Sequence, residues 1–175
     1  MIQISGSTKR LFLFPANLQK AFAYYSDIPR TIDFLPHISL VRSFAPHQYR
    51  LLYTYLESGL YRVKIYCDVL TLLDKKNRFI QIQPLEENPP VKSESGLYSM
   101  TSQGHHRSEI TFSELGNQTR IEYNISMDAS LPVPLTLRIV PNALLNNSAQ
   151  RKLSLHTDEI IDRFIEQSIR AFILE

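Results

Sequence analysis

The side chains best able to do chemistry in this chain are an adjacent pair of histidines and a set of tyrosines. His105 and His106 lie on a predicted strand, where neighbouring residues point to opposite faces, so both imidazoles cannot enter one site. His106 is expected to face inward beside Met127, and His105 outward. A single inward histidine with no carboxylate on its face is typical of a structural residue rather than a base or a ligand. We therefore predict no catalytic residue.

The face that the strand pattern turns inward is rich in tyrosine, at Tyr53, Tyr55, Tyr61 and Tyr123. A buried phenol needs a hydrogen-bond partner, so a sealed core usually contains Leu, Ile or Phe instead. Either these rings line a partly hydrated pocket, or they lie near its mouth with their hydroxyls in solvent. We favour the pocket, because it gives each hydroxyl a partner without exposing the ring.

Other kinds of catalytic or cofactor site lack their sequence signatures. The chain has no Gly-x-Ser-x-Gly, its five glycines are isolated and form no phosphate loop, and no Cys/His spacing suits a metal ion. The acidic residues Glu109, Glu122 and Asp128 fall at outward positions, where we expect solvated surface. His37 and His47 are expected in loops without a function. The sequence therefore predicts no metal site and no cofactor.

Length and composition indicate one globular domain over residues 1–175, with 43% apolar and 21% charged residues. The net charge of +2 and the scattered basic residues argue against a nucleic-acid partner. No apolar run reaches the length of a membrane span, so stable membrane insertion is not expected. Met1–Lys9 lacks the apolar centre of a signal peptide, and the single Cys67 favours a reducing compartment. We predict a cytoplasmic protein, and no protein partner is identified.

The C-terminal segment Pro141–Phe172 predicts one long amphipathic helix. It contains no glycine, and its apolar residues return every three or four positions, with Ile160 and Phe164 in the stripe. At about 1.5 Å per residue such a helix would exceed roughly 40 Å in length. One helix cannot bury its own apolar stripe, so the preceding segments must form the surface that receives it.

A first strand, two short helices and six further strands are predicted before this helix. Their ranges are Thr8–Phe14 for the first strand, Leu18–Tyr25 and Asp27–Phe34 for the helices, and Ile38–Ala45, Gln48–Glu57, Leu60–Leu73, Arg78–Leu85, Leu97–Leu115 and Gln118–Leu131 for the remaining strands. Gly104 is expected to form a bulge in the strand Leu97–Leu115. We expect these strands to build a curved sheet that grips the helix.

Three turns predict how neighbouring strands pair. The expected pairs are Phe112–Ile121, Ile110–Tyr123, Ser108–Ile125 and His106–Met127 in the last hairpin, Tyr55–Tyr61, Tyr53–Val63 and Leu51–Ile65 across Glu57–Gly59, and Val69–Ile82 and Thr71–Ile80 across Asp74–Asn77. In all three hairpins the apolar members fall on one face. The strand Ile38–Ala45 leaves two alternatives open, with either Val41 and Ser43 or Leu40 and Arg42 inward.

This element order resembles the START-like and polyketide cyclase-like (SRPBCC) superfamily. The segments that carry the resemblance are Phe14-Pro15-Ala16-Asn17, Asp27-Ile28-Pro29, Phe34-Leu35-Pro36-His37-Ile38 and the connector Leu131-Pro132-Val133-Pro134-Leu135 before the long helix. Within the superfamily the chain looks closest to an uncharacterised branch found in photosynthetic organisms. The resemblance implies an α+β helix-grip fold, in which a curved antiparallel sheet of about seven strands surrounds a long C-terminal helix. It also implies a cavity between sheet and helix that takes an apolar ligand.

The function predicted from these features is the binding or carriage of a hydrophobic small molecule, such as a lipid, an isoprenoid or a pigment. The expected ligand-binding residues share inward positions on the strands and the helix; they are Tyr53, Tyr55, Tyr61, Ile65, His106, Ile110, Phe112, Tyr123, Ile125, Met127, Ile160 and Phe164. Two alternatives remain: a cyclase- or aromatase-type enzyme that uses the same pocket, or a protein-interaction module without a ligand. The apolar connector Leu131–Val140 could gate the pocket or touch a membrane transiently, but we favour simple packing over the open end of the sheet.

Overall fold

The computed structural model describes residues 1–57, 61–134 and 142–174. Eight strands and three helices follow one another as β1 (Ile2–Phe14), α1 (Leu18–Ser26), α2 (Ile28–Ile32), β2 (Ile38–Ala45), β3 (Gln48–Glu57), β4 (Tyr61–Asp74), β5 (Phe79–Pro84), β6 (Glu94–Ser95), β7 (Ser99–Leu115), β8 (Gln118–Leu131) and α3 (Asn142–Leu174). The predicted order of a strand, two short helices, a run of strands and a long helix is confirmed.

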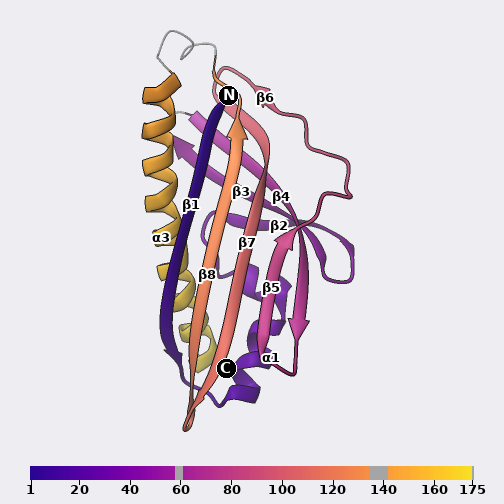
Figure 1. The fold of residues 1–175 in the computed structure, drawn as a ribbon, viewed down its shortest axis with the longest axis vertical. Coiled ribbons are helices and arrows are strands. Elements are labelled where there is room, and N and C mark those ends of the chain that lie inside the picture. Colours follow the sequence, from indigo (N-terminus) through magenta and orange to yellow (C-terminus); the bar gives the residue numbers. More distant parts are fainter. Residues whose placement is uncertain (58–60, 135–141, 175) are drawn as a thin grey trace.

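The strands form one curved sheet in the order β1-β8-β7-β5-β4-β3-β2, and the two-residue β6 pairs with β7. Neighbouring strands are antiparallel, except that the first part of β7 runs parallel to β4 beyond the end of the short β5. Figure 1 shows α3 lying along β1 on one side of the sheet, with α1 near the lower ends of the long strands. This arrangement is the expected helix-grip architecture.

The last hairpin pairs as the sequence predicts. Leu115 lies opposite Gln118, Ile110 opposite Tyr123, and His106 opposite Met127. Along β8 the residues alternate between buried and more exposed positions, because successive side chains point to opposite faces of a strand. The inward set Ile121, Tyr123, Ile125, Met127 and Ala129 is buried, which confirms the predicted parity.

Two other predicted registers are wrong by two residues. Tyr55 pairs with Val63 rather than Tyr61, and Ile82 pairs with Thr71 rather than Val69. In the hairpin of β4 and β5, the last pair before the loop is Asp74–Phe79, and each of its members lies one residue later in the sequence than predicted. The reason is that the Asp74 carboxylate accepts hydrogen bonds from the backbone N–H groups of Lys76 and Asn77 in this loop. A slip of two residues leaves every side chain on its original face, so the predicted inner face survives.

Two local predictions about backbone irregularities are also corrected. Gly104 forms no bulge but pairs regularly with Ala129; a Cβ there would lie 2.6 Å from Asp128 O and 2.7 Å from Ile65 Cγ2. Glycine is needed at this position because the neighbouring backbone and side chains approach too closely for a Cβ, not because the strand contains an extra, bulged residue. The irregularities lie instead in β2, between Leu40 and Arg42 and between Ser43 and Ala45, and neither predicted alternative holds along the whole strand.

Some strand and helix ends differ from the prediction. β1 begins at Ile2 rather than Thr8, and α2 ends at Ile32 rather than Phe34. The early part of β1 pairs continuously with β8, from Ile2 opposite Leu131 onwards. The expected turn at Ser58–Gly59, the start of the helix at Pro141 and most of the connector Leu131–Val140 lie outside the described residues.

Two short helices cover one end of the sheet, and side chains start each of them. Asn17 accepts a hydrogen bond from Lys20 N and begins α1, while Asp27 accepts one from Arg30 N and begins α2. Aromatic rings from α1 pack with rings from β1, β7 and α3, in the group Phe14, Phe22, Tyr24, Tyr25, Phe112, Phe164 and Phe172. These contacts pack Phe164 and Phe172 of α3 into a shared aromatic cluster.

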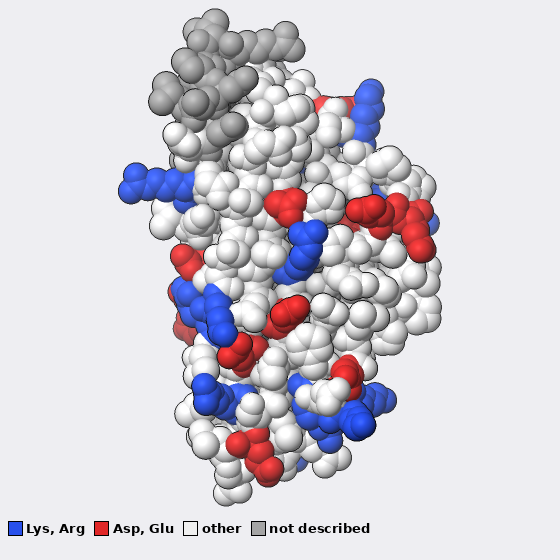
Figure 2. Space-filling model, in the orientation of Figure 1, with Lys and Arg blue, Asp and Glu red and all other residues white. Residues whose placement is uncertain are grey.

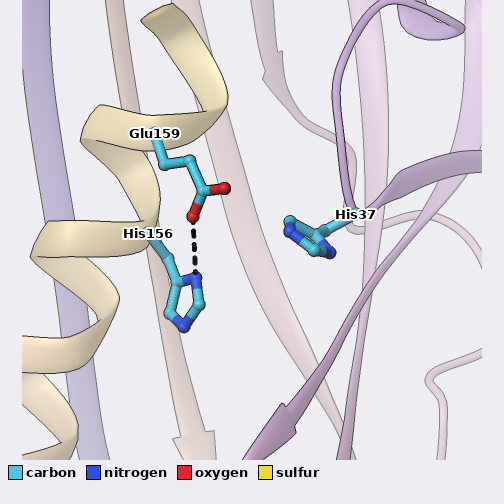
Figure 3. A group of neighbouring side chains, drawn as sticks. All are labelled: His37, His156 and Glu159. Atoms are coloured by element: carbon cyan, nitrogen blue, oxygen red, sulfur yellow. Dashed lines mark ion pairs between the residues drawn. The ribbon is translucent and has the colours of Figure 1, made fainter. Parts of the chain in front are cut away.

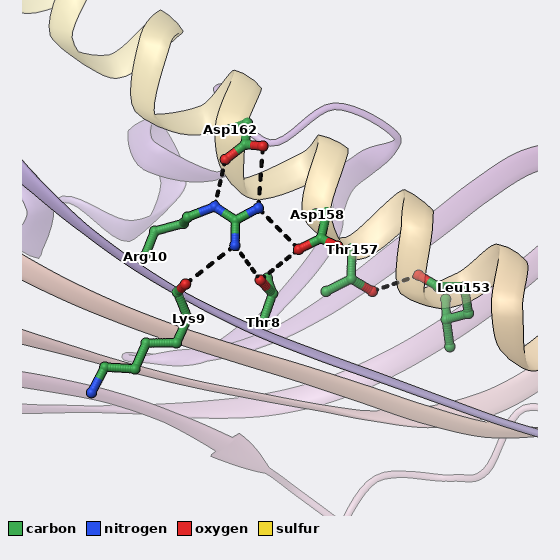
Figure 4. A network of polar contacts seen from close by, with 7 residues as sticks. All are labelled: Thr8, Lys9, Arg10, Leu153, Thr157, Asp158 and Asp162. Atoms are coloured by element: carbon green, nitrogen blue, oxygen red, sulfur yellow. Dashed lines mark hydrogen bonds and ion pairs between the residues drawn. The ribbon is translucent and has the colours of Figure 1, made fainter.

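Polar contacts fix α3 along β1 (Figure 4). The Arg10 guanidinium contacts both Asp158, at 3.0 Å, and Asp162, at 2.7 Å, and Thr8 Oγ1 donates to Asp158 at 2.7 Å. These hydrogen bonds from Thr8 and Arg10 hold the pKa of the Asp158 carboxyl below its usual value. Exposed ion pairs each contribute little stability, so the main effect of this network is to select the face of α3 that meets β1.

Charged side chains are mixed rather than segregated on the face seen in Figure 2, where blue and red residues alternate over the strands and α3. This distribution agrees with the scattered basic residues of the sequence. Among the described helices, none is both long enough and apolar enough to cross a lipid bilayer.

Gly6 of β1 lies close against Leu153 and Thr157 of α3, and its replacement tests this contact. Gly6→Ala is expected to lower the free energy of unfolding by about 1–3 kcal/mol. The added Cβ would lie 2.6 Å from Thr157 Oγ1 and 3.1 Å from Leu153 Cγ, so the helix or the strand must shift. Urea denaturation monitored by circular dichroism measures the loss.

The exposed Gly96 provides the matched control, because a Cβ there meets only ordinary contacts at 3.5 Å or more. Gly96→Ala should leave stability nearly unchanged. Adding Thr157→Ala to Gly6→Ala should recover part of the loss, since it removes the nearest atom. Equal stability of the Gly6 and Gly96 variants would contradict the close crossing.

Candidate functional site

The candidate site is the inner face of the sheet, opposite α3. Of the predicted lining residues, all but Tyr61 are buried: Tyr53, Tyr55, Ile65, His106, Ile110, Phe112, Tyr123, Ile125, Met127, Ile160 and Phe164. They come from β3, β4, β7, β8 and α3 and belong to one hydrophobic cluster, apart from the polar His106. The structure therefore brings most of the predicted set together, and its role in binding stays a prediction.

The end of this face near α1 is filled with aromatic rings. The Phe164 ring lies 5.2 Å from that of Tyr123 and 5.9 Å from that of Tyr25, measured between centroids. Phe112 packs edge-on against Phe22 at 5.4 Å. Rings at these separations are in contact, so this end of the inner face is filled by packed side chains and has little space for a ligand.

The middle of the inner face is more polar. Thr71, Ser108 and His106 are buried there, and Thr71 and Ser108 lie in one cross-strand row on either side of Ile82. Among the described residues, Thr71 Oγ1 and Tyr53 Oη have no hydrogen-bond partner. Each such buried atom costs about 1–3 kcal/mol, and native proteins leave few of them. A polar group entering this region would recover that cost.

Burial shifts the titration of the groups on this face. It lowers the pKa of His106 to about 4, so the ring is neutral near pH 7 and offers one donor and one acceptor. Burial also raises the pKa of Tyr123 to about 12, and a hydrogen bond with the Ser108 hydroxyl lowers it by a smaller amount. The pKa of Tyr53 is raised by burial first, and then by the charges of Tyr55 and Glu159. These phenols are therefore uncharged donors.

Tyr61 differs from the other predicted lining residues in its surroundings. Tyr61 is only partly buried at the start of β4, and its hydroxyl lies 2.7 Å from Gly96 O and 3.1 Å from Ser99 O. The phenol of Tyr61 thus already has backbone acceptors. Cys67 is buried, and burial raises the pKa of its thiol to about 12, as is typical of an unreactive cysteine in an apolar core.

A second group of side chains lies at the edge of this face and was missed in the sequence. His156 and Glu159 project from α3 toward His37, which lies just before β2 (Figure 3). One ligand atom of each residue lies within 4.8 Å of those of the other two. The sequence prediction gave His37 no function and did not consider His156. The spacing His156-x-x-Glu159 on a helix was the available signal, because residues three apart share a helix face.

Two hollows open on the surface around β1 and β8. One, of about 520 Å³, lies across β1, β8, β7 and β5, and its lining includes the outer residues Lys9, Arg107 and Asn124 together with Ser108 and Ile125 at inner positions. The other, of about 220 Å³, lies where β1 and β8 meet α3, beside Gln150 and Ser154. Neither is lined by the tyrosines of the inner face.

The structure was compared with known proteins. No family model and no curated protein sequence matches the chain. Solved structures do match. One is a protein of Thermus thermophilus, with 14% identity, a TM-score of 0.55 and coverage of 95% of this chain and 98% of that one. A conserved protein of Geobacillus kaustophilus matches with 10% identity, a TM-score of 0.56 and coverage of 96% and 94%.

An aromatase/cyclase of a Streptomyces species also matches, with 14% identity, a TM-score of 0.51 and coverage of 95% of this chain and 90% of that one. At such identities the likeness is one of fold alone. The chain therefore has the helix-grip fold that its sequence predicts. The narrower resemblance to a branch from photosynthetic organisms receives no support from these matches.

Proposed function

We propose that the protein binds a hydrophobic small molecule between the inner face of its sheet and α3. The observation that carries this proposal is a pair of buried hydroxyls without a hydrogen-bond partner among the described residues, Tyr53 Oη and Thr71 Oγ1, in mostly apolar surroundings. Apolar binding sites usually combine many hydrophobic contacts with a few polar groups that orient the ligand. A lipid or isoprenoid with one oxygen-bearing end fits this combination.

The helix-grip fold supports the same proposal in a general way, since it sets a curved sheet opposite one helix. The likeness to an aromatase/cyclase does not carry that protein's reaction to this chain. His106, Tyr53 and Tyr123 are neutral near pH 7 and therefore suit the orientation of a neutral oxygen atom. Binding rather than turnover is the simpler use of these residues.

The test is a titration of the full chain with an apolar fluorescent probe, followed by displacement with a fatty acid or an isoprenoid alcohol. We expect one saturable site. Tyr53→Phe should weaken displacement by the oxygen-bearing competitor about fivefold, equivalent to the loss of one hydrogen bond of about 1 kcal/mol. The same change should stabilise the ligand-free protein by a similar amount, because it removes a buried hydroxyl that has no partner among the described residues.

Tyr98→Phe is the matched control, because Tyr98 is 68% exposed and loses only a solvated hydroxyl. Arg120→Ala, at an outward position of β8, should also leave binding unchanged. A folded protein that binds no probe would refute the proposal and favour the interaction module. Identical behaviour of the Tyr53 and Tyr98 variants would remove the assigned orienting role of the Tyr53 hydroxyl.

A further inference from the structure

The edge of the inner face holds two imidazoles and a carboxylate at short distances. His156 Nδ1 lies 3.9 Å from Glu159 Oε2, and the nearest nitrogen of His37 completes a set whose members all lie within 4.8 Å. His156 Nδ1 is buried and has no hydrogen-bond partner among the described residues. Figure 3 shows the His37 ring across from the two α3 side chains.

From this geometry we propose that His37, His156 and Glu159 bind a divalent transition-metal ion of the zinc type. Two imidazole nitrogens and one carboxylate oxygen are the donors that such ions prefer, whereas calcium and magnesium prefer oxygen ligands alone. Ligand atoms around tetrahedral zinc lie about 3.3 Å apart, given bonds of about 2.0–2.1 Å. Small side-chain rotations would bring the three atoms from their present separations to that value.

The backbone holds each proposed ligand in place. His156 and Glu159 share one face of α3, which packs along β1. His37 adopts a left-handed backbone with φ of 65°, and its carbonyl accepts a hydrogen bond from Thr54 N of β3 at 2.9 Å. The ligands thus come from two separately anchored elements, and ion binding would join α3 to the start of β2.

Neighbouring side chains orient the two α3 ligands. Arg163 contacts Glu159 Oε1 at 3.0 Å, which leaves Oε2 directed to His156. The His156 ring packs against Tyr55, with centroids 5.2 Å apart. Contacts of this kind fix the direction of metal ligands in other proteins. The exposed His37 provides a route of entry from solvent.

Three protein ligands leave at least one coordination position for water or another oxygen atom. The inferred site lies beside Tyr53 and Tyr55 of the candidate ligand-binding face, since the Glu159 charge acts on the Tyr53 phenol. The inference does not rest on the proposed function, because it requires only the three side chains and their separations.

The experiment is a titration of the metal-free full chain with Zn²⁺ by calorimetry and with Co²⁺ by visible absorption. We expect one equivalent of either ion to bind, and the Co²⁺ complex to show the intense bands of four- or five-coordination. His156→Phe, Glu159→Gln and His37→Asn should each weaken binding more than about tenfold, the least effect expected for a direct ligand. Phe keeps a ring against Tyr55, and Asn tolerates the left-handed backbone at position 37.

His47→Asn is the matched control, since His47 is also an exposed loop histidine with a positive φ, of 64°. It should leave binding unchanged. The inference is overturned if the folded wild-type protein binds neither ion. It is also overturned if any of the three ligand variants binds as the wild type does, since the ion would then lie elsewhere. Apolar probe binding is measured separately, so failure of one proposal does not imply failure of the other.

Discussion

Phe164→Ala is expected to lower the free energy of unfolding by about 3–5 kcal/mol. Phe164 is 2% exposed in α3, and its ring contacts Tyr123 of β8 and Tyr25 of α1. These neighbours belong to elements other than α3, which limits how far they can close over the lost ring. The cost should therefore include both the lost burial and the cavity that remains. Urea denaturation at constant pH measures the change.

Leu155→Ala on the same helix is the control, because Leu155 is 64% exposed. It should change stability by less than about 0.5 kcal/mol. A loss below about 1 kcal/mol for Phe164→Ala would mean that its ring is not packed as described. An intermediate loss would instead indicate that the ring borders space, where it has fewer contacts to lose.

Much of the fold follows from local signals in the sequence. The regular alternation of β8 and the two-residue turn Gly116–Asn117 together determine which residues of β7 and β8 face α3. The registers around β4 were wrong, since turn chemistry decides how far a hairpin extends. Asp74 illustrates this: it was predicted to lie in the loop, but it ends β4 by pairing with Phe79, and its carboxylate accepts hydrogen bonds from the loop's backbone. Both register errors were of two residues, an even number, so the residues predicted to lie on the inner face are still the correct ones.

The cluster of His37, His156 and Glu159 could not be predicted in the same way. Only the pair on α3 has a recognisable spacing, and a pair three residues apart is common on helices. His37 reaches it through the packing of α3 and the start of β2 onto one sheet, which is a long-range property. The contact of Gly6 with Thr157 is similar, because it depends on where α3 crosses β1.

His106 is expected to make the protein less stable in mild acid. Burial lowers the pKa of its imidazole to about 4, from the ordinary value of 6.5. Between these two values the unfolded chain binds a proton at this residue and the folded protein does not, so a fall in pH favours unfolding. The contribution is fully present above pH 6.5, is lost progressively down to about pH 4, and amounts to about 3 kcal/mol.

Urea denaturation of the wild type and His106→Gln across this pH range measures the effect. The variant cannot take up the proton, so its stability should fall less steeply from pH 6.5 to about 4, whatever its stability at neutral pH. His105→Gln, at the neighbouring outward position, should retain the wild-type contribution of His106. Parallel curves for the wild type and His106→Gln would show that the imidazole is not desolvated. A steeper fall of stability for the wild type than for His106→Gln would instead support a neutral, buried His106 on the inner face at physiological pH.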